Sequence, residues 1–101
     1  MNKFIVAVGA VLLSTAGLSQ ARDIGVDEAL KLQQAGTIKS FEEMNKAALA
    51  KHPGAVIEDT ELDEEHGRLI YQVELRDPAG PEWDLEFDAT TGELLQDHRD
   101  D

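Results

Sequence analysis

The side chains best suited to chemistry in this 101-residue sequence are its carboxylates, 21 in number against nine lysines and arginines. They form two groups, one nearly continuous and one spread over two later segments: Glu58, Asp59, Glu61, Asp63, Glu64 and Glu65, then Glu74, Asp84 and Glu86. Such a surface attracts cations or a basic protein and repels nucleic acid and anionic lipid. Neither group has the spacing of an EF-hand loop, so we predict no specific metal site.

The three histidines complete no catalytic arrangement. His52 ends a predicted helix, His66 lies in a predicted hairpin loop, and His98 lies in a polar C-terminal segment. The sequence has no HExxH motif, no Ser/His/Asp order and no glycine-rich phosphate loop. It also has no cysteine, which excludes thiol chemistry and thiolate metal sites. We therefore expect neither an enzyme nor a bound cofactor.

The first 21 residues predict a secretory signal peptide. Lys3 supplies a positive charge, residues 4–18 are mainly apolar, and Ser19-Gln20-Ala21 places small residues at a cleavage site. The apolar run is shorter than the roughly 20 residues that a spanning helix needs. Cleavage after Ala21 predicts a periplasmic or secreted protein without a membrane span.

The remaining residues, 22–101, predict one small acidic domain. They carry all 21 acidic residues and eight of the nine basic ones, a net charge of −13. A chain of this size is near the limit at which one hydrophobic core suffices, and no disulfide can assist it. Either of two roles explains this charge: solubility in a crowded compartment, or attraction of a basic partner. The sequence does not predict the oligomeric state.

The stretch from Tyr71 to Leu95 organises the domain. Apolar and polar residues alternate strictly around Tyr71 and again around Trp83, which is typical of strands with one buried and one solvated face. One core is predicted from Phe41, Met44, Leu69, Tyr71, Val73, Leu75, Trp83, Leu85 and Phe87. Asp88 and Gly92 bound a turn in which the carboxylate accepts from backbone amides and the glycine takes a left-handed conformation.

Two helices are predicted before the strands. Residues 22–37 form an arm with a short helix over 24–35 that ends at Gly36. Ser40 and Glu43 have the spacing of a capping box, which starts a second helix over 41–51. His52-Pro53-Gly54 then stops it. Its alanines suggest close approach to a sheet.

A further strand over 55–63 has poorer alternation, which predicts a bulge or a partly exposed edge. Short connections make neighbouring strands antiparallel, and only the second helix is available to cover the apolar face. The sequence therefore predicts a two-layer α+β domain, with a helix, preceded by a short helix, packed on a meander of three or four antiparallel strands. Residues 97–101 are predicted to form a disordered acidic tail.

The order of these segments resembles a PepSY domain over residues 38–96. The resemblance rests on AALAKHPG ending a helix, an acidic strand, GRLIYQVEL, and the closing WDLEFDATTGELL, where Asp88, Ala89 and Gly92 precede Glu93-Leu94. PepSY domains occur in propeptides of thermolysin-like peptidases, in spore-germination proteins and as small secreted proteins. The resemblance implies a non-catalytic module that inhibits or modulates a peptidase.

Two functional hypotheses follow from these observations. The first is a module that binds a protein in the cell envelope, a peptidase or a sensor domain, through the exposed first strand and the acidic sheet face. The second is an acidic protein that binds or responds to cations. The family resemblance supports the first hypothesis, and the charge supports the second.

Overall fold

The computed structural model describes residues 22–100, so the predicted signal peptide at residues 1–21 lies outside the described part of the chain. The elements in chain order are β1 (Arg22–Asp23), α2 (Val26–Gln34), α3 (Phe41–Lys51), β2 (Val56–Glu65), β3 (Arg68–Arg76), β4 (Glu82–Asp88) and β5 (Leu94–Asp100). No helix in this part of the chain is long and apolar enough to cross a membrane.

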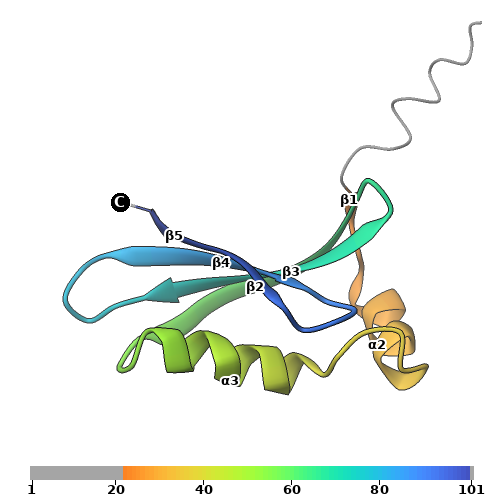
Figure 1. Ribbon diagram of the computed structural model, residues 1–101, viewed down its shortest axis with the longest axis horizontal. Coiled ribbons are helices and arrows are strands. Elements are labelled where there is room, and N and C mark those ends of the chain that lie inside the picture. The colour runs from red at the N-terminus through yellow and green to blue at the C-terminus, as the bar shows by residue number, and fades with distance from the viewer. Residues whose placement is uncertain (1–21, 101) are drawn as a thin grey trace, which may run out of the picture.

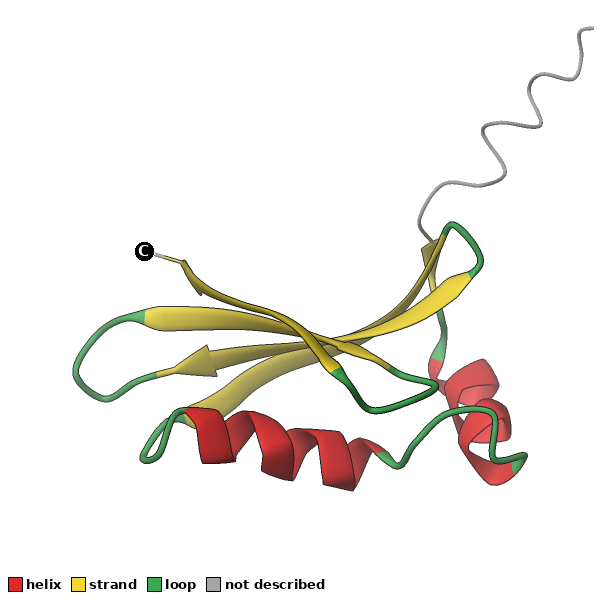
Figure 2. Ribbon diagram, viewed as in Figure 1, coloured by secondary structure: helices red, strands yellow, loops and turns green. Residues whose placement is uncertain are grey.

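The strands form one antiparallel sheet in the order β1-β2-β3-β4-β5. Helix α3 lies along one face, and α2 packs at the end of the sheet where β1 lies (Figures 1 and 2). The predicted α+β architecture is confirmed, with five strands rather than three or four. Strand β1 is too short to predict from alternation.

The core lies between α3 and the sheet. Its largest fully buried side chains are Phe87, Met44, Leu75, Leu85 and Val73, each at most 2% exposed. The ring of Tyr71 stacks on Phe41 at 5.0 Å between centroids, and its hydroxyl donates to Asn45 at 2.8 Å. The strand residues that make these contacts all lie on one face of the sheet, as the alternation predicted. Three residues predicted for the core are only partly buried and pack against it: Phe41, Leu69 and Trp83.

Local sequence signals determine how three elements begin or bend. The Ser40 hydroxyl accepts from the Glu43 backbone amide at 3.1 Å and caps α3. Strands β2 and β3 are joined by His66 and Gly67, both with positive φ, as the twist of a two-residue hairpin requires. The pairing of β2 with β3 shifts between Ile57 and Asp59, which confirms a bulge.

The predicted disordered tail requires correction. Strand β5 continues to Asp100 and pairs with β4, with Leu85 opposite Asp97 and Trp83 opposite Arg99. Backbone pairing with a neighbouring strand orders this polar segment, although it offers no apolar alternation for sequence reasoning to detect.

Candidate functional site

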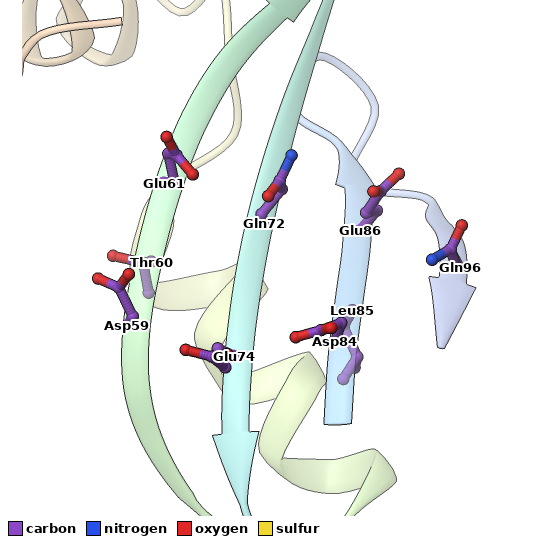
Figure 3. Close-up of a pocket in the computed structure, with 9 residues that line it drawn as sticks. All are labelled: Asp59, Thr60, Glu61, Gln72, Glu74, Asp84, Leu85, Glu86 and Gln96. Atoms are coloured by element: carbon purple, nitrogen blue, oxygen red, sulfur yellow. The ribbon is translucent and has the colours of Figure 1, made fainter. Parts of the chain in front are cut away.

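The acidic residues of β2, β3 and β4 meet on the sheet face opposite α3. The register aligns Asp59 with Glu74 and Glu74 with Asp84, in one row across three strands. A second row contains Glu61 and Glu86, separated by Gln72 (Figure 3). No helix of the described residues covers this face (Figure 2). We call these carboxylates, with Asp63 and Glu65 of the same parity on β2, the acidic face.

The acidic face contains a shallow hollow of about 240 Å³. Its lining is mostly polar and is formed by residues of β2, β3, β4 and β5: Asp59, Thr60, Glu61, Gln72, Glu74, Asp84, Leu85, Glu86 and Gln96. Carboxylate and amide groups from four strands therefore lie on this one face, spread along and across the strands (Figure 3). An arrangement with so many acceptors suits a cation or a basic side chain and lacks a nucleophile held by a base.

Two of the predicted site residues are placed differently. Glu58 lies at the bulge of β2, and its carboxylate accepts from Arg76 at 2.5 Å. Glu64 points to the opposite face from Asp63, and it accepts from Arg22 at 2.9 Å. Each of these carboxylates already has an arginine partner, so we exclude them from the acidic face.

Asp23, which sequence reasoning did not select, completes a carboxylate group at one end of the acidic face. Strand β1 places Asp23 opposite Asp63, and Asp23, Glu61 and Asp63 each have a carboxylate oxygen within 4.8 Å of the others. A hydrogen bond between Asp23 and Glu61, with burial and the charge of Asp63, raises the pKa of Glu61 to about 7. Burial, together with the neighbouring Asp23 carboxylate, raises the pKa of Asp63 to about 6.

The pKa values of two carboxylates at the centre of the acidic face are also raised. Burial and the charge of Asp84 raise the pKa of Glu74. Burial and the charge of Asp100 raise the pKa of Asp84, and His98 opposes this effect. Like charges on adjacent strands repel, so the folded acidic face holds protons more tightly than separated carboxylates would.

The raised pKa values predict that stability falls as the pH rises from 5 to 8. Between the ordinary carboxyl pKa near 4 and the folded values of about 6 and 7, the folded protein retains protons that the unfolded chain has released. The favourable contribution is complete below pH 4 and is lost as the pH passes 7. Melting temperatures at fixed ionic strength with a chelator present should therefore be higher at pH 5 than at pH 8.

The matched variant for this measurement is Asp23→Asn, which removes the charge and the partner that raise both pKa values. The melting temperature of this variant should depend less on pH over the same range. A melting temperature that rises from pH 5 to pH 8 in the unmodified protein would contradict the arrangement of the group.

The outer edge of β2 is largely unpaired. Within the described residues, β1 pairs only with Asp63 and Glu64, and Ile24 donates to the Leu62 carbonyl at 2.7 Å. Because backbone groups alternate in direction, Thr60 also directs its N–H and C=O away from β3. Beside this edge is a largely apolar hollow of about 420 Å³, lined by Asp23, Ile24, Val26, Ala29, Leu30, Phe41, Thr60, Glu61, Leu62 and Tyr71.

Comparison with known families identifies the domain. The family model PepSY, described as "Peptidase propeptide and YPEB domain", matches residues 38–98. The chain belongs to the PepSY family. The match covers α3, strands β2 to β4 and most of β5, and it ends two residues beyond the predicted boundary at residue 96. Comparisons with curated proteins and with solved structures gave no match.

The closing turn of the PepSY domain is built around Asp88. One carboxylate oxygen accepts from the backbone amides of Thr90 and Thr91 at 2.9 and 3.2 Å, and the other accepts from Arg68 at 3.3 Å. Gly92 has φ +82°, which other residues rarely adopt. The predicted local role of both residues is therefore seen in the structure, and neither belongs to the acidic hollow.

A second polar contact of the PepSY domain joins the end of α3 to β5. His52 stacks on Trp83 with ring centroids 4.2 Å apart, and its Nε2 lies 2.8 Å from a carboxylate oxygen of Asp97. Sequence reasoning missed the pairing with Asp97, since that residue was assigned to the tail. The contact places His52 at a packed helix end, as its position before Pro53 indicated.

Proposed function

We propose that this protein is a non-catalytic PepSY binding module of the cell envelope that modulates a peptidase or the extracytoplasmic domain of a sensor. The description of the family supports a peptidase-related role, because it names the peptidase propeptide. Export through residues 1–21, cleavage after Ala21 and a periplasmic or secreted location are part of this proposal. The module acts by occupying a surface of its partner and performs no bond chemistry.

The unpaired edge of β2 is the observation that carries the proposal. A partner segment in extended conformation could add to this edge through the backbone groups of Thr60 and its neighbours. Apolar side chains of the segment would enter the hollow that Phe41 and Tyr71 line. Basic side chains of alternate parity would lie over Asp59 and Glu61 on the acidic face.

Inhibition of a thermolysin-type metallopeptidase by the purified protein tests the proposed function. Thr60→Pro removes an N–H at the outer edge and leaves the pairing of β2 with β3 intact, so it should weaken inhibition without unfolding the domain. Thr60→Val keeps the N–H and serves as the matched control. The proposal fails if the protein changes no envelope peptidase activity and captures no protein at low salt.

Charge on the acidic face should control the rate of association with the partner. Asp59→Asn combined with Glu61→Gln should slow association about threefold or more at low ionic strength and change dissociation less. Added salt should reduce the difference from the parent protein, because it screens exposed charges. Surface plasmon resonance at two salt concentrations measures both rates.

The control removes the same charge elsewhere, through Glu42→Gln on α3 combined with Glu93→Gln in the closing turn. Both of these side chains are exposed and lie outside the acidic face. Equal association rates for the two double variants would show that net charge alone, and no specific face, governs binding.

A broader replacement of Glu61, Asp63, Glu64 and Glu65 by amides should also slow association, as the acidic-face variant does.

A further inference from the structure

Three carboxylates converge where β1 joins β2. Asp23, Glu61 and Asp63 each direct a carboxylate oxygen to within 4.8 Å of the other two. Two of them belong to one strand and the third to its neighbour, so the group spans the junction between the N-terminal arm and the sheet. Three acceptors at this separation repel each other unless a positive species lies between them.

Asp63 supplies a second and separate observation. The residue is only 6% exposed, and its Oδ2 accepts from the Gln72 side-chain amide at 2.8 Å. Its Oδ1 is buried and has no hydrogen-bond partner among residues 22–100. A buried carboxylate oxygen without a donor is costly, so a ligand that supplies positive charge at this atom would stabilise the described domain.

The neighbouring arginine does not neutralise the group. Arg22 directly precedes Asp23, but alternation directs its side chain to the opposite face. Its guanidinium donates to Glu64 at 2.9 Å and to Glu28 at 3.3 and 3.4 Å. The positive charge of Arg22 is therefore engaged by Glu64 and Glu28 and does not offset the three carboxylates.

A comparable group of three carboxylates at the other end of the acidic face does have an arginine partner. Glu74, Glu82 and Asp100 also bring oxygens within 4.8 Å of one another. There, however, Arg76 lies 2.8 Å from a Glu82 oxygen, and none of the three has a buried oxygen without a partner. We therefore propose no cation site at that second group.

We propose that Asp23, Glu61 and Asp63 bind a divalent cation, calcium by preference, which fastens β1 to β2. Carboxylate oxygens are the ligands of hard cations, and calcium tolerates the irregular geometry that ligands from two strands offer. Water completes the six to eight ligands that calcium takes. The bound ion gives Asp63 Oδ1 its missing partner and holds the arm that carries α2 against the sheet.

Calcium titration of the purified protein at pH 8 and constant ionic strength tests this site. Thermal melting should show a saturable rise, by about 5 °C or more at 10 mM calcium if the dissociation constant is near 10⁻³ M. Calorimetry with calcium chloride should give one site. Hydrogen exchange in residues 22–34 should slow when calcium is present, because the ion secures the arm.

Asp23→Asn and Asp63→Asn should each lower calcium affinity tenfold or more. Glu42→Gln removes the same charge from α3, outside the acidic face, and should leave the affinity unchanged. Asp23 is exposed, so its variant keeps the test valid if Asp63→Asn fails to fold. No rise in melting temperature, or an equal rise in all three variants, would overturn the site in favour of diffuse screening.

Discussion

Replacing Phe87 by alanine is expected to leave the protein largely unfolded at room temperature. Phe87 is 1% exposed and lies in the β4 row that faces α3, with Leu85 beside it. Loss of such a ring costs about 3–5 kcal/mol, through lost transfer free energy and the cavity left behind. A domain of this size without disulfides has a total stability of about 5 kcal/mol, so the variant loses most of it.

Urea unfolding followed by circular dichroism measures this change. The matched control is Val26→Ala, a large-to-small change at a side chain that is 76% exposed, which should alter stability by about 0.5 kcal/mol or less. A similar, small effect of Phe87→Ala would contradict the packing of β4 against α3, and the predicted core with it.

Alternation and capping were sufficient to predict the central part of the fold. The period of two around Tyr71 and Trp83 placed β3 and β4 with the correct faces inward, because each has one apolar and one polar side. The spacing of Ser40 and Glu43 located the start of α3. These signals succeed because the cause of each element lies within its own residues.

Elements held by a neighbouring strand gave no such signal. Strand β5 is exposed along most of its length, and its residues after Leu94 are polar or exposed on both faces. Strand β1 has two residues, and its position depends on pairing with Asp63 and Glu64. In both cases the backbone of a distant segment supplies the stabilising hydrogen bonds, which no local pattern records.

For the candidate site too, local patterns predicted some residues, and others could be placed only from strand pairing. Parity along β3 and β4 correctly predicted that Glu74, Asp84 and Glu86 share a face. On β2, the bulge after Ile57 changes the parity of the residues that follow, so the register was needed to show that Asp59 belongs to this face. Asp23 joins the group only through the pairing of β1.

Replacing Asp88 by alanine is the second change expected to have a large effect, a loss of about 2 kcal/mol in the free energy of unfolding. The carboxylate is 9% exposed and serves the amides of Thr90 and Thr91 as well as Arg68. Its removal deprives the turn of hydrogen bonds to a charged acceptor, which are worth about 1.5–3 kcal/mol. The turn also positions Lys39, whose N–H donates to the carbonyl of Ala89.

Asp88→Asn separates the two roles of this carboxylate in the same urea unfolding measurement. The amide oxygen still accepts from Thr90 and Thr91, while the ion pair with Arg68 is lost. Because the Arg68 side chain is 55% exposed, that pair contributes about 1 kcal/mol or less, so Asp88→Asn should be clearly more stable than Asp88→Ala. Equal losses in both variants would assign the stability of the turn to the ion pair. An alanine variant as stable as the parent that no longer binds its partner would instead make Asp88 a recognition residue.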